Sequence, residues 1–110
     1  MIQDILSRIE AAIWKIGATD RKEKTELLKL FSQLKSEIEG LSGTHGEQAR
    51  SIAGFADLAA HEATREVQSR RLLDLSLEGL SSSVRGFELS HPRLVETTNE
   101  ICLLLSKIGI

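Results

Sequence analysis

The chain has 110 residues, of which 41% are hydrophobic and 27% charged, which suits one globular domain and argues against disorder. Its 14 basic and 16 acidic residues give a formal net charge of −2, so we expect no generic nucleic-acid binding. Only 4% of the residues are aromatic, and an aliphatic core favours packed helices over a β-sandwich. We therefore predict a single all-α domain over residues 1–110.

The first predicted helix covers about residues 2–16, where apolar residues recur with the spacing of one helix face. These are Ile2, Ile5, Leu6, Ile9, Ile13 and Ile16. Gly17 is placed to end this helix. Trp14 lies well over about 100° from the centre of the apolar stripe. It either anchors a partner surface or shows that this helix is buried on two sides, and the sequence supports both interpretations.

The second predicted helix begins at Asp20, which with Glu23 gives the acidic first turn that helix N-termini favour. Its apolar residues alternate by four and three along one face. They are Leu27, Phe31, Leu34, Ile38 and Leu41. Gly40, Ser42 and Gly43 then close the helix.

A long central helix is predicted from about Glu47 to Leu89. Thr44 and Glu47 have the spacing of a capping box, which marks a helix start. No Gly or Pro occurs between Phe55 and Glu78. At ~1.5 Å per residue the helix would be roughly 65 Å long. Such a rod greatly exceeds the radius of gyration of about 13 Å expected for a compact domain of this length.

This central helix carries a heptad-like seam of mostly apolar residues. The seam contains Ile52, Ala56, Ala59, Ala63, Glu66, Arg70, Leu73, Leu77, Leu80, Val84 and Phe87. Weak helix formers near its end make a break near Gly79 the alternative. The small residues that begin the seam indicate tight packing, against either the second helix or a partner chain.

The last predicted helix begins at Pro92, since proline suits a first helical turn and pushes His91 out of the helical region. It runs to about Lys107 with an apolar stripe. The stripe contains Leu94, Thr98, Ile101, Cys102, Leu105 and Ile108. The predicted fold is thus four helices, in which hairpins pack along the long central helix as a bundle.

Because its own chain is too short to cover such a rod, we expect a twofold homodimer. The candidate interface residues are Trp14, Ala56, Ala59, Ala63, Glu66, Arg70, Leu73 and Leu77. Glu66 and Arg70 are charged residues in an otherwise apolar seam. They either pair between the two chains of an antiparallel dimer, or form an ordinary i,i+4 pair within one helix.

No motif predicts catalysis or metal binding. His61 and Glu62 resemble the start of a zinc-protease helix, but Arg65 stands where the second histidine would be needed. Glu88 and His91 have the spacing of a di-iron helix, without the second copy that such a site requires. Cys102, the single cysteine, has no visible base or resolving partner and is expected to be a buried small hydrophobe. We therefore predict no enzyme, cofactor or metal.

The sequence also bears on location. The start Met1–Asp4 lacks the basic and apolar regions of a signal peptide, and no run of about 18 apolar residues suggests a transmembrane segment. A lone cysteine excludes an intrachain disulfide and fits a reducing compartment. We expect a cytoplasmic protein.

The segment Phe87-Glu88-Leu89-Ser90-His91-Pro92, followed by an apolar helix that ends in Ile108-Gly109-Ile110, is similar to a signature of one protein family. It resembles short bacterial proteins, classed as a domain of unknown function, that share F-E-x-S-H-P and then a helix ending in Gly-Ile. The likeness covers about residues 87–110, and the Ala-rich middle and Cys102 depart from it. The resemblance implies a small helical cytoplasmic protein and supplies no activity, substrate or cofactor.

Taken together, these features predict a non-enzymatic module for homo-oligomerisation or interaction. The alternative is an adaptor or regulatory protein that binds a different protein through its helical surface, with Trp14 and Leu103 among the contacts. Association with a membrane surface through the first helix is a weaker third possibility, because that helix lacks a basic polar face.

Overall fold

The computed structural model describes residues 2–14 and 21–108, and within them all regular structure is helical. The helices are α1 (Ile2–Trp14), α2 (Arg21–Ser42), α3 (Gly46–Ala63), α4 (Arg70–Ser83) and α5 (Pro92–Ile108). The prediction of an all-α fold is confirmed, with five helices in place of four. The predicted cap at Gly17 and helix start at Asp20 lie outside the described residues.

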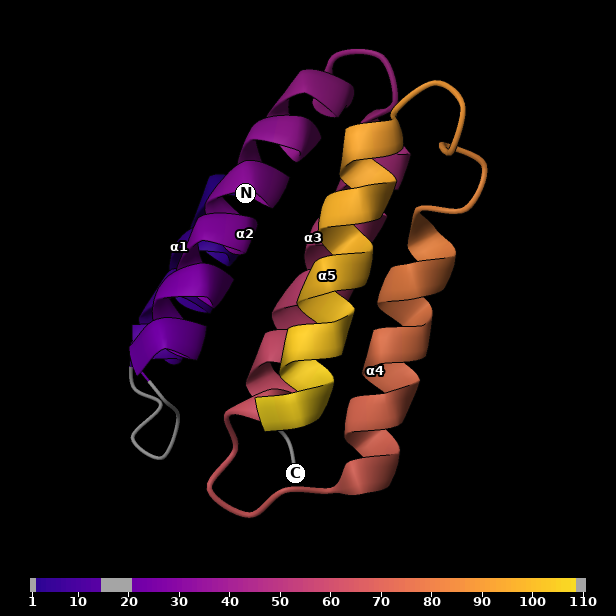
Figure 1. The fold of residues 1–110 in the computed structure, drawn as a ribbon. Coiled ribbons are helices and arrows are strands. Elements are labelled where there is room, and N and C mark those ends of the chain that lie inside the picture. The colour runs from indigo at the N-terminus through magenta and orange to yellow at the C-terminus, as the bar shows by residue number, and fades with distance from the viewer. Residues whose placement is uncertain (1, 15–20, 109–110) are drawn as a thin grey trace.

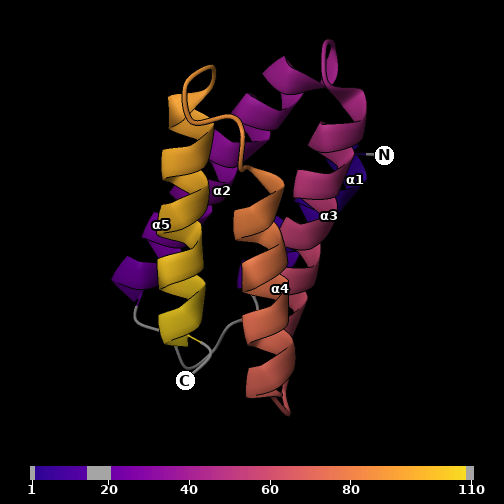
Figure 2. The ribbon, with the colours of Figure 1, turned by 90° about the vertical axis from the view of Figure 1, so that its right-hand side faces the viewer.

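The helices stand side by side as an antiparallel bundle (Figures 1 and 2), with α3 in contact with each of the other four. Among the described helices, α4 contacts only α3 and α5, so it forms one edge of the bundle. The molecule measures 38 × 24 × 23 Å with a radius of gyration of 12.9 Å. These dimensions belong to a chain that covers its own core.

The prediction of one long central helix is therefore wrong. The helix ends at Ala63, and residues 64–69 lead into α4, which runs back along α3. Gly79 lies inside α4, so the break is not at the predicted alternative position either. The excess rod length that required a partner chain does not exist, and any case for association has to rest on the surface of this bundle.

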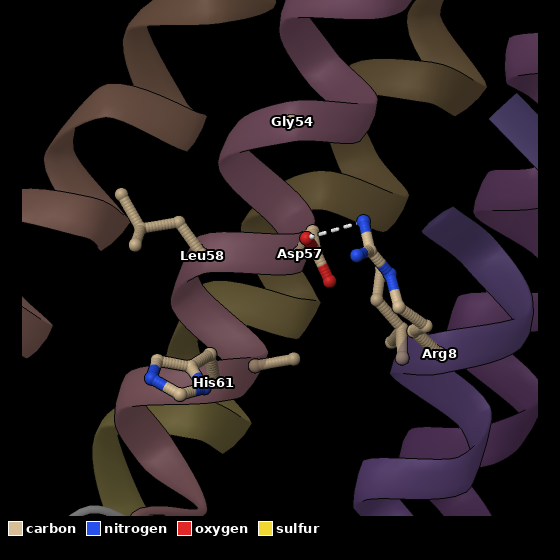
Figure 3. Close-up of a pocket in the computed structure, with 7 residues that line it drawn as sticks. Arg8, Gly54, Asp57, Leu58 and His61 are labelled. Carbon is tan, nitrogen blue, oxygen red and sulfur yellow. Dashed lines mark hydrogen bonds and ion pairs between the residues drawn. The ribbon is translucent and has the colours of Figure 1, made fainter. Parts of the chain in front are cut away.

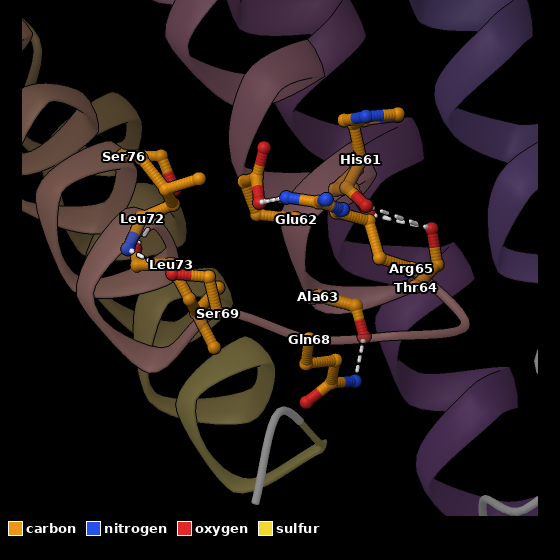
Figure 4. Close-up of polar contacts among 11 residues, drawn as sticks. His61, Glu62, Ala63, Thr64, Arg65, Gln68, Ser69, Leu72, Leu73 and Ser76 are labelled. Carbon is orange, nitrogen blue, oxygen red and sulfur yellow. Dashed lines mark hydrogen bonds and ion pairs between the residues drawn. The ribbon is translucent and has the colours of Figure 1, made fainter.

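Side chains rather than Gly or Pro make the turn between α3 and α4 (Figure 4). The Thr64 hydroxyl donates to the Ala60 carbonyl oxygen at 2.8 Å, and the Gln68 amide donates to the Ala63 carbonyl oxygen at 2.8 Å. Ser69 is the N-cap of α4, and its hydroxyl accepts from the Leu72 backbone N–H at 3.3 Å. The bonds of Gln68 and Ser69 satisfy backbone groups that a helix end leaves without intrahelical partners, whereas the Thr64 hydroxyl adds a second donor to a carbonyl oxygen that already accepts from the Thr64 backbone N–H.

Packing explains why the chain turns back here. The alanines of α3 are almost wholly buried, and their small side chains allow neighbouring helices to approach closely. On α4, Leu73 and Leu80 are fully buried in the same cluster. Removing each leucine from water stabilises the fold by about 2 kcal/mol. The small residues thus pack within one chain, where the sequence had also allowed a partner chain.

Several local predictions have clear outcomes. The stripe of the second predicted helix is buried, as expected. On α5, which begins at Pro92, Leu94, Thr98, Ile101 and Leu105 of the predicted stripe are buried and Cys102 is half-buried. The capping box is wrong, because the N-cap of α3 is His45, which makes no side-chain cap bond. The Thr44 hydroxyl instead donates to the Leu41 carbonyl oxygen at 3.4 Å and contacts His45 Nδ1 at 2.8 Å.

Candidate functional site

Four large apolar side chains are exposed on the two helices that form the turn. Phe55 and Leu58 of α3 are 37% and 45% exposed, and Leu72 and Leu75 of α4 are 44% and 51% exposed. We call the surface that these four residues form the α3–α4 face. Elsewhere in the described chain, exposed apolar residues such as Leu89 and Leu103 come from other elements, and such scattered residues are ordinary.

The antiparallel register places these four residues next to one another. The Phe55 ring occupies the space that a Cβ atom on Gly79 would need, which fixes residue 55 opposite residue 79. Three residues further along α3, Leu58 lies at the level of residue 76 and so beside Leu75, because α4 is counted in the opposite direction. Leu72 lies about one helical turn from Leu75, towards the N-terminus of α4. The α3–α4 face is therefore contiguous over roughly 10 Å along the helix axes.

Charged residues border this face on α4. Arg71 and Glu78 are exposed on either side of Leu75, on the same side of the helix. Within the described part of the chain, neither side chain takes part in an ion pair or a hydrogen bond. One end of the face thus carries a free positive charge and the other a free negative charge.

The charged pair predicted in the seam is not formed. Glu66 lies in the connection 64–69, so it does not share a helix with Arg70. The Arg70 guanidinium contacts Asp74 at 3.1 Å and donates to the Ser106 carbonyl oxygen and hydroxyl, both at 3.2 Å. Arg70 therefore ties α4 to α5 within one chain. Both earlier interpretations of Glu66 and Arg70 depended on a continuous helix, which is absent.

The other predicted interface residues separate into two groups. Ala56, Ala59, Ala63 and Leu73 are fully buried, and Leu77 is half-buried against the same core. The four fully buried residues therefore have no surface to offer to a partner. The α3–α4 face itself was missed, because its residues lie beside the seam rather than in it. Only the turn at 64–69 brings them together.

Trp14 is 65% exposed, so its side chain is not buried on a second side of α1. The Lys24 ammonium group lies 5.5 Å from the centroid of the indole ring, a cation–π contact between α1 and α2. A role of Trp14 in an interface stays a prediction. Its contact with α2 places it apart from the α3–α4 face.

A hollow of about 500 Å³ lies between α1 and α3 (Figure 3). Its lining consists of Arg8, Ile9, Gly54, Asp57, Leu58, Ala60 and His61. Arg8 Nη2 lies 3.1 Å from Asp57 Oδ2 across it. Because these side chains are 66% and 32% exposed, the pair contributes at most about 1 kcal/mol. The Asp57 carboxylate is already paired with Arg8, and the lining contains no serine, threonine or cysteine, so the hollow suits a helix contact better than a reaction.

A second polar cluster lies where two connections meet at one end of the bundle. The rings of His45, Phe87 and His91 pack edge to face, with centroids 5.4–6.1 Å apart. The Glu88 carboxylate accepts from the backbone N–H of Gly86, whose φ of 96° suits glycine. The residues that carried the family resemblance thus build the α4–α5 turn. Among the described residues, no three potential metal ligands gather at one place.

Cys102 is half-buried on α5, and its Sγ lies 3.8 Å from the Leu77 carbonyl oxygen. Burial raises the pKa of its thiol from 9.0 to about 11. We therefore expect alkylation by iodoacetamide at pH 7 to be about 100-fold slower than for an ordinary thiol, since only the thiolate reacts. The rate should rise until about pH 11. A rate that levels off near pH 9 would contradict this environment.

None of the described helices is long and apolar enough to cross a membrane. Comparison of the chain with protein-family models, with curated proteins and with solved structures gave no match. The resemblance seen over residues 87–110 therefore stays a prediction from sequence.

Proposed function

We propose that this protein is a non-enzymatic helical module that binds another polypeptide through its α3–α4 face. The observation that carries the proposal is the contiguous exposure of Phe55, Leu58, Leu72 and Leu75 on a bundle that otherwise covers its core. Contiguous apolar surface of this kind marks interaction sites on soluble proteins. A helix from a partner fits such a seam, because it can lay its own apolar stripe along the two helices.

The composition of this face supports binding over catalysis. Apolar side chains lie at its centre, and the charged Arg71 and Glu78 lie at its border, the arrangement found in protein interfaces. Half-exposed leucines gain roughly 1 kcal/mol each when a partner covers them. With so few anchor residues the surface is small, and we expect a dissociation constant on the order of 10 μM.

Site-specific photo-crosslinking tests this proposal without knowledge of the partner. A benzophenone amino acid replaces Leu58 or Leu75 in one set of variants and the exposed Asn99 of α5 in the control. We expect discrete adducts from positions 58 and 75 in the cells that produce the protein, and none from position 99. The mass of the adduct tells whether the partner is a second copy or a different protein. Equal yields at all three positions, or no adducts, would overturn the proposal.

A further inference from the structure

We infer that the partner on the α3–α4 face is a second copy of this chain, with α4 antiparallel to α4 of that copy about a twofold axis near Leu75. The inference rests on the proposed function, because it assigns the partner of the same surface. It differs from the dimer expected from sequence in its residues and its cause. It rests on the charge pattern of α4, a short helix at the edge of the bundle, and not on an apolar seam along one long helix.

The spacing of charges on α4 is self-complementary. Arg71 and Glu78 are seven residues apart, two helical turns, so both project from the same side of α4. Leu75 lies between them, four residues from one and three from the other. When two such helices meet antiparallel at Leu75, Arg71 of each copy lies opposite Glu78 of the other. A parallel arrangement would instead bring like charges together.

The position of α4 in the bundle makes this contact accessible. Among the described helices it touches only α3 and α5, so its outer side is open (Figure 2). Leu72 and Leu75 of each copy would cover one another at the centre, with Phe55 and Leu58 completing the apolar area. Arg71 and Glu78 have no partner within the described chain, so pairing them between copies breaks no existing interaction.

The Arg71–Glu78 pairs determine the register of the two α4 helices more than they raise the affinity. Exposed ion pairs are individually weak, but like charges that face each other disfavour the wrong register. Each Arg71–Glu78 contact nevertheless occurs twice because of the twofold symmetry. A single charge reversal therefore converts two attractions into two repulsions. We expect it to weaken association by about tenfold or more.

Sedimentation equilibrium of charge-reversed variants tests the inference. Arg71→Glu makes the border of the face wholly negative, and Glu78→Arg makes it wholly positive. We expect each variant alone to associate at least about tenfold more weakly than the native chain. An equimolar mixture should associate at least as tightly as the native chain, because opposite borders then meet. The double variant Arg71→Glu/Glu78→Arg should also recover association.

The matched control is Glu96→Arg at an exposed position of α5, and this variant should leave association unchanged. Recovery in the mixture also shows that the single variants are folded. A native chain that stays monomeric at 200 μM, or a mixture that fails to recover, would overturn the second copy as partner. Discrete crosslinks from position 75 to a different protein would then leave the proposed function standing. Absence of crosslinks would overturn both.

Discussion

Replacing Leu73 by alanine is expected to lower the free energy of unfolding by about 3 kcal/mol. Leu73 is fully buried in the main apolar cluster, where α4 packs onto the rest of the bundle. Alanine removes the buried methyl groups and leaves a cavity that the neighbouring helices fill only in part. Urea unfolding followed by circular dichroism measures the change. It should be independent of protein concentration, because the contact lies within one chain.

The adjacent residue provides the matched control. Leu72 is 44% exposed on the α3–α4 face, so Leu72→Ala should lower the free energy of unfolding by less than about 1 kcal/mol. The same substitution should weaken any association through this face. Equal destabilisation by the two variants would mean that α4 does not turn Leu73 inward and Leu72 outward.

Enlarging Ala59 to leucine is the second large effect, and we expect it to lower the free energy of unfolding by about 2–3 kcal/mol. Ala59 is fully buried and lies one turn along α3 from Phe55, on the side that faces α4. Three added carbon atoms would force these closely packed helices apart. Thermal unfolding of the purified chain gives the measurement.

Gly54 of the same helix, which is exposed and lines the hollow between α1 and α3, offers the opposite case. Apart from the neighbouring residues and backbone of its own helix, no atom lies within 4 Å of a Cβ built on Gly54, so Gly54→Ala adds a methyl group into open space. We expect the free energy of unfolding to rise by up to about 1 kcal/mol, from improved helix propensity alone. If Ala59→Leu were tolerated as well as Gly54→Ala, α3 and α4 could not be packed closely against each other.

The predictable parts of the fold are those set by local periodicity. The apolar stripe of α2 and the residues Leu94, Ile101 and Leu105 of α5 are buried as expected, since their spacing admits only one inward face. Pro92 fixed the start of α5 for an equally local reason. These features need no knowledge of what the helix packs against.

The turn at 64–69 could not be predicted in the same way. Thr64, Gln68 and Ser69 cap two helix ends, yet the same residues are tolerated inside a continuous helix. What decides between the two states is the burial of Leu73 and Leu80 in a core built from distant parts of the chain. The free energy gained by this burial depends on tertiary contacts, so the local spacing of apolar residues does not reveal it.

The candidate site was missed as a consequence of the same error. In a straight helix, Phe55 and Leu75 would be about 30 Å apart, so nothing would join them into one surface. The predicted interface residues Ala56 and Ala59 are instead fully buried within the bundle. These residues were predicted to be buried by a second copy, and helices of the same chain bury them instead.

The hairpin of α3 and α4 is the basis of every proposal made for this protein. Spin labels at Ser51→Cys and Ser82→Cys in a Cys102→Ala background test it directly, because both serines line one hollow between these helices. The labels should lie within about 20 Å of each other. Dilution with unlabelled chains should not change that distance, since both labels belong to one molecule. A separation of about 45 Å, as in a continuous helix, would contradict the account.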